Sequence, residues 1–242
     1  MNLKQPSLLA ARGLTCSRAL DRLTPSRVCD LSLEFEEKTT TLIWGGEGCG
    51  KNLLLRMLGL MEPPDAGEVL LHGSSTRRLS EEERAVSRNE HFGFLFAAPF
   101  LLPSFSLIEN IAMPLFKISS VNTDQALHRT QTVLDFVGLN ARAHSAVEEL
   151  SLPDQQRASL ARALVNRPDI LIVENLDASL QAGEQQIFLE LFQRAATEFA
   201  TTTIITVANA ELARFADRGI EMAEGRVVQD DRTTPADHGA RL

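Results

Sequence analysis

The residues best suited to chemistry in this sequence form a glycine-rich segment near residue 50. Gly45 and Gly50 are separated by four residues, and Lys51 follows directly. Glycines let the backbone turn so that successive N–H groups point inward and surround phosphate oxygens. A helix that begins there adds its partially positive N-terminus, and the lysine adds a point charge for the β- and γ-phosphates. The spacing is that of a Walker A loop and predicts phosphate binding. The alternative is a glycine-rich turn that carries a surface lysine.

We expect ATP with Mg²⁺ to be the ligand of this segment. The Walker A pattern continues with Ser or Thr, whose hydroxyl binds Mg²⁺, but this sequence has Asn52. An amide oxygen can ligate a hard cation, although it lies farther out on the side chain. Phosphate binding is therefore expected to persist while metal placement degrades. The expected nucleotide contacts are Gly45, Gly46, Glu47, Gly48, Cys49, Gly50, Lys51, Asn52 and Leu53.

Several further segments, in matching order along nearly the whole chain, resemble the ATP-binding cassettes (ABC) of transporters. Residues 68–73 are similar to the strand after the first helix of that family, and residues 154–157 and 160–168 to the helix after its signature motif. Residues 101–115 are similar to the lipoprotein-releasing, macrolide-export and cell-division cassettes. Lipid-trafficking cassettes are a close second subgroup.

The resemblance implies an α/β fold, a P-loop NTPase with a parallel-sheet core, an N-terminal antiparallel β-subdomain and an inserted helical subdomain. It makes residues 1–242 a single cassette. The nucleotide-binding core is expected at residues 1–96 and 166–230, the helical subdomain at 97–165 and a flexible tail at 231–242.

The family's signature motif is altered in this chain. That motif, LSGGQ or a close variant, binds the γ-phosphate held by the other subunit, and the resemblance aligns it with Ser151, Leu152, Pro153 and Asp154. Leu152 adds bulk where the backbone must approach, and Pro153 lacks an N–H. We favour the interpretation that this segment is a well-capped helix start and a degenerate signature.

The expected Walker B strand is altered at its end. In the family this strand ends in Asp and Glu, which hold the metal and polarise the attacking water, but here the apolar run 170–173 ends in Glu174 and Asn175. Glu174 joins Asn52 as a candidate metal ligand. Asn175 cannot accept a proton, and loss of a general base costs about 10²–10⁴ in rate.

Three other family positions lack their expected side chains. The glutamine that senses metal and γ-phosphate aligns with Ala97, and the switch histidine aligns with Ala208. The aromatic that stacks on adenine would fall near residues 17–18, yet no aromatic precedes Phe35. Together these losses predict hydrolysis at background level, so no catalytic residue is assigned.

An apolar stretch follows the strand predicted at residues 92–96. In the family this region lines the groove that receives a coupling helix of the membrane subunit, and ordinary core packing of the helical subdomain is an equal alternative. The candidate groove residues are Phe96, Phe100, Leu101, Leu102 and Phe105.

The elements that must position these residues alternate along the chain. Alternation of strands and helices favours an α/β core with a parallel sheet. The pattern predicts strands at 28–35, 39–44, 67–73, 92–96, 170–173 and 202–207, and a hairpin near residue 225. It predicts helices after residues 51, 80 and 106 and at 124–137, 153–165, 181–199 and 210–215.

Composition excludes several classes of function. The net charge of −8 disfavours nucleic-acid binding. Three cysteines and five histidines without ligand spacing disfavour disulfides and metal sites and favour surface or structural roles for the histidines. There are 12 Phe, a single Trp at position 44 and no Tyr. No apolar run approaches the roughly 18 residues of a membrane span, so we expect a cytoplasmic protein held at the membrane through a partner.

The primary hypothesis is a degenerate ATP-binding subunit of an ABC transporter of the lipoprotein, lipid or macrolide export type. Its expected partners are a membrane subunit and a second cassette, in a homo- or heterodimer. A structural or regulatory pseudo-ATPase that does not use ATP is the alternative. A working ATPase in which Glu174 acts alone is a third possibility.

Overall fold

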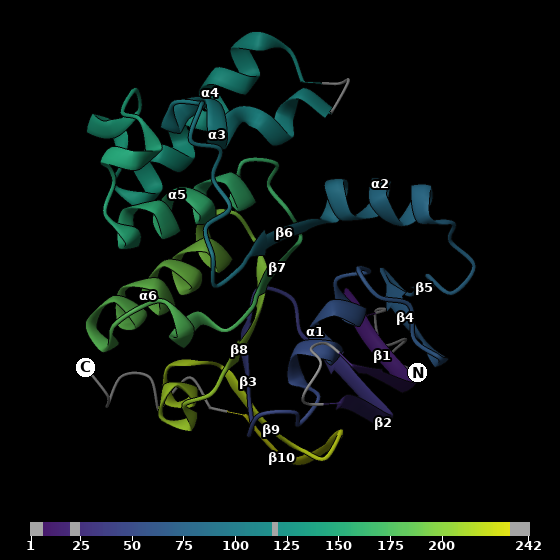
Figure 1. Ribbon diagram of the computed structural model, residues 1–242. Coiled ribbons are helices and arrows are strands. Elements are labelled where there is room, and N and C mark those ends of the chain that lie inside the picture. Colours follow the sequence, from purple (N-terminus) through teal and green to yellow (C-terminus); the bar gives the residue numbers. More distant parts are fainter. Residues whose placement is uncertain (1–6, 20–24, 118–120, 233–242) are drawn as a thin grey trace.

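The computed structural model describes residues 7–19, 25–117 and 121–232, and two sheets organise them (Figure 1). The four-stranded sheet has the order β2-β1-β4-β5 and the six-stranded sheet the order β10-β9-β3-β8-β7-β6. The strands are β1 Leu9–Ala19, β2 Pro25–Phe35, β3 Thr40–Trp44, β4 Ala66–Leu71, β5 Ser74–Ser75, β6 Phe92–Leu95, β7 Ile170–Val173, β8 Thr202–Val207, β9 Arg218–Ala223 and β10 Arg226–Arg232. The α-helices are α1 Lys51–Leu58, α2 Glu81–His91, α3 Leu107–Ala112, α4 Thr123–Val137, α5 Leu152–Leu164 and α6 Ala182–Glu198. The 3₁₀ helices are η1 Met113–Lys117, η2 Asn140–Arg142, η3 Val147–Glu149, η4 Leu176–Ala178 and η5 Ala210–Phe215.

The six-stranded sheet is parallel except for β10, and both of its faces are covered. Successive side chains of a strand point to opposite faces. In β7, Ile170 and Ile172 accordingly join one apolar cluster while Leu171 and Val173 join the other. Burial on both faces explains why this strand is a continuous apolar run. Figure 1 shows α5 and α6 on one side of the sheet and α1 on the other.

Helix α1 lies between the two sheets. Its Leu53, Leu54 and Leu58 are fully buried in the cluster that also contains Leu14 and Val28 of the antiparallel sheet. This layering of an antiparallel sheet, α1 and a mostly parallel sheet confirms the predicted α/β class.

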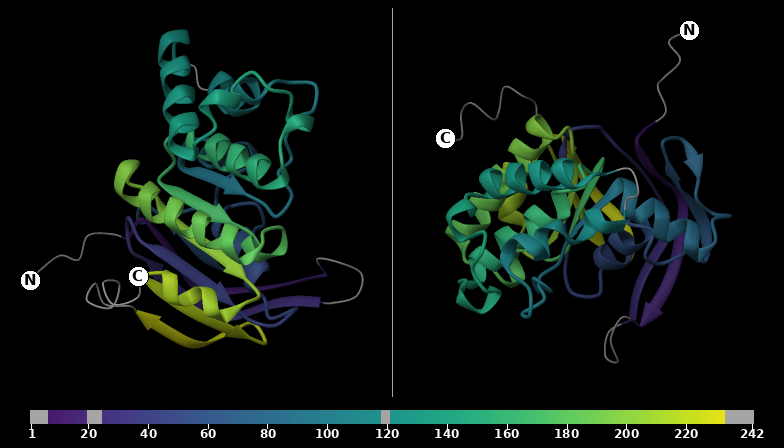
Figure 2. Two further views of the ribbon diagram at one scale, coloured as in Figure 1. Left: turned by 90° about the vertical axis from the view of Figure 1, so that its left-hand side faces the viewer. Right: turned by 90° about the horizontal axis from the view of Figure 1, so that it is seen from above.

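The named elements between β6 and β7, among the residues that the structure describes, are all helices joined by loops: α3, η1, α4, η2, η3 and α5. Figure 2 shows these helices, α3 to α5, extending from one end of the six-stranded sheet. The helix predicted after residue 106 is confirmed as α3, and Ser106 and Glu109 form a capping box at its start. Ser80 and Glu83 cap α2 in the same way. The boundaries of a helical subdomain at 97–165 stay a prediction.

The strand β1 and the segment 210–215 are the main differences from the sequence prediction. The pattern assigned no strand before residue 28, whereas β1 pairs with both β2 and β4. Its register shifts between Ala11 and Leu14, and such irregularities break the alternation by which a strand is recognised. The helix expected at 210–215 is the 3₁₀ helix η5. Of the predicted tail, residues 231 and 232 belong to β10, and 233–242 lie outside the described residues.

The position of α1 between the sheets generates a stability prediction. Leu54→Ala removes a side chain with no exposed surface, and should lower the free energy of unfolding by about 2–5 kcal/mol in urea denaturation. Val86→Ala is the control, because Val86 is 56% exposed, and it should change stability by less than about 0.5 kcal/mol. Equal losses in both variants would contradict the layered core.

Candidate functional site

The loop at residues 45–50 connects β3 to α1 in a conformation that requires glycine. Gly45 and Gly50 have φ values of 154° and 102°, in the region that side-chain-bearing residues avoid. A Cβ on Gly45 would lie 2.2 Å from the Met222 carbonyl oxygen, and one on Gly50 would lie 2.1 Å from the Arg27 carbonyl oxygen. The turn is therefore held by close backbone contacts with β9 and β2.

Lys51 is directed into this loop. Its Nζ donates to the carbonyl oxygen of Gly45 at 2.9 Å, and the residue is only 8% exposed. The alternative of a surface lysine is therefore wrong. Gly50 caps α1 without a side-chain hydrogen bond, and the first N–H groups of a helix have no partners within the helix. Cationic and N–H donors thus converge on one loop, and that combination suits phosphate oxygens.

Asn52 and Glu174 supply oxygen atoms near the ends of α1 and β7. Asn52 Oδ1 is buried and has no hydrogen-bond partner among the described residues. Such an atom costs roughly 1–3 kcal/mol in lost hydration. Burial raises the pKa of Glu174, opposed by the positive charge of Arg56. An unsatisfied amide oxygen and a desolvated carboxylate are both donors that a hard cation such as Mg²⁺ accepts, so these residues fit the ion.

Asn175 occupies a conformation that suits its side chain. Its φ is 50°, a left-handed value that Asn tolerates better than most residues. Its N–H donates to Thr206 Oγ1 at 3.0 Å. Asn175 therefore stabilises a turn. Its side chain is an amide at the position where the family resemblance predicts a carboxylate that accepts a proton.

Ala97 and Ala208 present no polar side chain, but their backbones are held. Gln156 is almost fully buried and donates through Nε2 to the Ala97 carbonyl oxygen and to Ser179 Oγ. Asp177 Oδ2 accepts the N–H of Ala208 at 2.8 Å and that of Asn209 at 2.9 Å. Neither Gln156 nor Asp177 is among the predicted site residues. A glutamine on the apolar face of α5 was the one available signal for the former.

The side chain of the N-cap residue Ser151 caps the start of α5. Ser151 Oγ accepts the N–H of Asp154 at 3.3 Å, and Pro153 lies in the first turn. Asp154 also pairs with Arg157. This arrangement confirms the prediction of a capped helix start. Leu152, next to the cap, is exposed.

The candidate groove residues separate into two groups. Phe96 lines a pocket of about 710 Å³ together with Phe92, Phe94 and Arg162. The rings of these three phenylalanines stack in succession, with centroids 6.0 and 6.1 Å apart, along the edge strand β6 and the residue that follows it. The pocket thus has an aromatic wall.

The loop after β6 carries the other candidates. Phe100 packs edge-on against Phe96 and is 67% exposed. Arg162 donates to the carbonyl oxygens of Phe100 and Pro99 at 2.7 and 2.9 Å, which fixes the loop. Leu102 and Phe105 are exposed, whereas Leu101 is buried in the core. Leu101 therefore belongs to the core, whereas Phe100, Leu102 and Phe105 lie on an open surface.

The position expected to stack on adenine holds an ion-paired arginine. Arg18 lies 2.8 Å from Glu62 and 2.7 Å from Asp65. Hydrogen bonds to these two carboxylates raise the pKa of Arg18. Separately, none of the helices in the described part of the chain has the length and apolarity needed to cross a bilayer.

Sequence comparisons match most of the chain. A family model described as ABC transporter matches residues 28–177. The chain is 34% identical over 198 residues to the lipoprotein-releasing system ATP-binding protein LolD of Bacteroides fragilis, covering 82% of this chain and 91% of that protein. It is 37% identical over 199 residues to LolD of Bordetella avium, covering 82% and 86%.

Solved structures share the fold. The dimeric post-hydrolysis state of the ATP-binding cassette MJ0796, bound to ADP and Pi, has a TM-score of 0.81 at 24% identity and covers 93% of this chain and 98% of that one. The cbiO1 structure from Clostridium perfringens, part of the ABC transporter complex cbiONQ, has a TM-score of 0.83 at 21% identity and covers 98% and 92%. At these identities the likeness concerns the fold alone.

The phosphate-loop geometry generates a binding prediction. ATP should change the fluorescence of Trp44, because this single tryptophan directly precedes the loop. Lys51→Ala should weaken ATP binding at least about 10-fold, since a charged hydrogen bond is worth about 1.5–3 kcal/mol. Calorimetry on the same samples measures the affinity independently.

The control is Lys38→Asn, which removes an exposed lysine at a left-handed position that Asn tolerates. It should bind ATP as the unmodified chain does. Equal affinity of Lys51→Ala and the unmodified chain would show that ATP binds elsewhere. Absence of both heat and fluorescence change would favour the pseudo-ATPase that does not use ATP.

Proposed function

Since the chain belongs to the ABC transporter family of ATP-binding cassettes, which confirms the resemblance in its sequence, we propose that it is the ATP-binding subunit of a lipoprotein-releasing transporter. The family membership rests on a family model that matches residues 28–177 and on relatives more than 30% identical over most of the chain. The named activity of those relatives supports lipoproteins over other lipids or macrolides as the exported class.

The observation that carries the proposal is the loop at residues 45–50. Its glycine conformation, the inward Lys51 and a helix start without a side-chain cap together suit phosphate oxygens, and they support the proposal. ATP would lie with its phosphates on Gly45–Lys51, and Asn52 and Glu174 would hold Mg²⁺. A bound Mg²⁺ would neutralise phosphate charge.

We further propose that hydrolysis is lost or very weak in this chain. Asn175 cannot take a proton from water, and Ala97 and Ala208 offer no polar side chain to the γ-phosphate. Each missing preorganised donor typically costs about 10²–10³ in rate. Such losses are not additive, yet all of them act on the same transition state, which depends on positioning and charge stabilisation.

One observation supports a working ATPase as the second candidate. Burial raises the pKa of Glu174, and a general base is most effective when its pKa approaches the working pH. Glu174 acting alone is therefore the residue on which any residual hydrolysis would depend.

The proposed partners are a membrane subunit and a second cassette, in a complex at the cytoplasmic face of the membrane. The aromatic pocket beside Phe96 and the exposed Phe100 support docking of an apolar segment. We also propose residues 97–165 as the helical subdomain that carries this surface. A dimer would pair the residues 45–50 of one subunit with the start of α5 of the other.

Turnover measurements test the proposed loss of hydrolysis. The purified chain with Mg²⁺ and ATP should release phosphate at the rate of a protein-free control, and Lys51→Ala should not change that rate. Glu174→Gln provides the second comparison. Phosphate release that both substitutions abolish would overturn the proposed loss and favour the working ATPase.

Co-purification tests the docking surface. Phe100→Glu should abolish association with a candidate membrane subunit that is co-expressed or added in detergent, because a charge would enter an apolar contact. Phe116→Glu is the matched control, since Phe116 is 81% exposed and does not line the pocket. Retention of the partner by both variants would count against this surface.

A further inference from the structure

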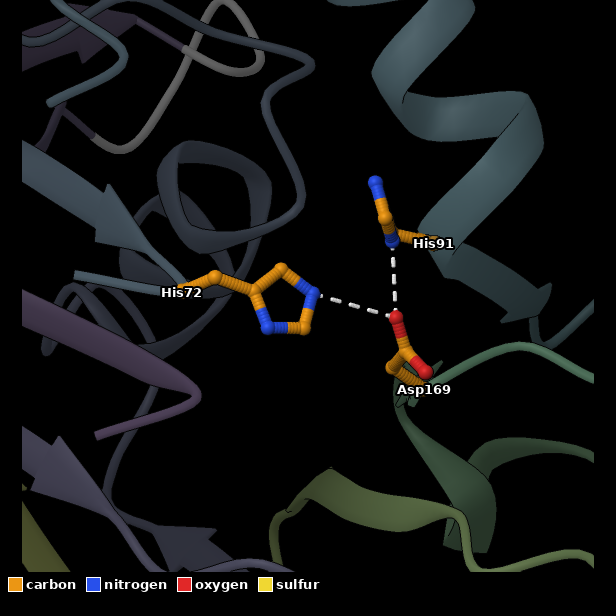
Figure 3. Close-up of side chains that lie close together, drawn as sticks. All are labelled: His72, His91 and Asp169. Carbon is orange, nitrogen blue, oxygen red and sulfur yellow. Dashed lines mark hydrogen bonds and ion pairs between the residues drawn. The ribbon is translucent and has the colours of Figure 1, made fainter. Parts of the chain in front are cut away.

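Three side chains outside the phosphate loop converge on one point. His72 and His91 both direct a ring nitrogen at the carboxylate of Asp169 (Figure 3). The residues are distant in sequence, and each comes from a different segment. His72 follows β4 of the antiparallel sheet, His91 ends α2, and Asp169 immediately precedes β7 of the six-stranded sheet.

The distances bring the three donor atoms into one small volume. His72 Nε2 lies 3.2 Å and His91 Nδ1 lies 2.7 Å from Asp169 Oδ2. All three ligand atoms lie within 4.8 Å of one another. In a tetrahedral zinc site with bonds near 2.0–2.1 Å, neighbouring ligand atoms are roughly 3.3 Å apart. Small side-chain rotations would therefore bring the three atoms around one ion.

Backbone hydrogen bonds hold two of the three ligands in place. His72 has a left-handed φ of 49°, and its N–H donates to the Leu8 carbonyl oxygen at 2.8 Å. The carbonyl oxygen of Asp169 accepts the N–H of Thr202 at 2.9 Å. The side chains themselves are partly exposed, so an ion can enter from solvent and a water molecule can complete its coordination.

We propose that His72, His91 and Asp169 form a binding site for a divalent transition-metal ion, with Zn²⁺ as the best fit. Two imidazoles and one carboxylate are a donor set that suits zinc, copper, iron and nickel, whereas Mg²⁺ and Ca²⁺ prefer oxygen donors throughout. Without the ion, each neutral imidazole donates its one N–H to Asp169; when the ion binds, that proton moves through water to the other ring nitrogen, and the nitrogen facing Asp169 offers its lone pair to the metal. The site joins the antiparallel sheet to the edge of the parallel sheet.

This site is separate from the phosphate loop and does not depend on ATP. The ordinary role of such a cluster is a hydrogen-bonded link between α2, the β4–β5 turn and β7, with no ion bound. The two roles differ in one measurable property, which is saturable metal binding.

Calorimetric titration with Zn²⁺ tests the proposal on the full chain, prepared without a polyhistidine tag. One Zn²⁺ should bind per chain. His72→Asn and Asp169→Asn should each weaken binding at least about 10-fold, as even the loss of groups supporting a ligand does. Asn tolerates the left-handed backbone of residue 72, so His72→Asn should fold normally, as circular dichroism would verify. Zn²⁺ should also raise the melting temperature of the unmodified chain and leave that of His72→Asn unchanged.

His128→Asn is the matched control, because His128 is an exposed histidine of α4 distant from Asp169 in sequence and in element. It should bind Zn²⁺ as the unmodified chain does, and Mg²⁺ should give no heat at this site in any variant. A Cu²⁺-loaded sample gives a second readout, since electron paramagnetic resonance detects nitrogen ligands, and the two-nitrogen pattern of the unmodified chain should be absent in His72→Asn. Absence of saturable Zn²⁺ binding, or binding that persists in His72→Asn through the cysteines, would overturn the proposal.

Discussion

The close approach of three backbone segments at Gly50 is the constraint on which the rest of the structure depends. Gly50 faces the carbonyl oxygen of Arg27, and Gly225 of the β9–β10 turn faces the same oxygen. Only glycines permit this spacing, because a Cβ at either position would overlap with backbone. The contact determines where α1 begins. Helix α1 then packs between the two sheets and contacts both. The same backbone contact thus positions both the phosphate loop and α1, the central layer of the fold.

The positions that differ from the family motifs, or the residues next to them, have structural roles in this fold, most of them hydrogen bonds. These roles do not depend on any catalytic function. Asn175 suits its left-handed backbone, Ser151 caps α5, and Gln156 holds the backbone of Ala97. Asp177 similarly holds the turn after β8. The geometry of these loops therefore depends on residues other than those proposed to act on ATP, because different residues determine position and chemistry.

Much of the fold could be predicted because its signals are local. Buried strands are apolar runs. A capping box, in which Ser80 or Ser106 is followed three residues later by a glutamate, indicates a helix start from four consecutive residues. The strand β1 escaped prediction because its register shifts interrupt the alternation of side chains. Of the site, the phosphate loop has a contiguous motif. The His72–His91–Asp169 cluster has none, since its members meet only after three segments are brought together by the two sheets.

The stacked phenylalanines of β6 lie on the last strand of the parallel sheet. An edge strand presents unpaired N–H and C=O groups, and natural proteins blunt such edges with charges, prolines or a covering element. Here the edge adjoins an aromatic wall and the exposed Phe100. An apolar surface therefore lies next to a strand edge, and this combination favours self-association when no other element or partner covers it. A comparison of the yield of soluble chain expressed alone with the yield obtained with a partner would therefore report on assembly as well as on folding.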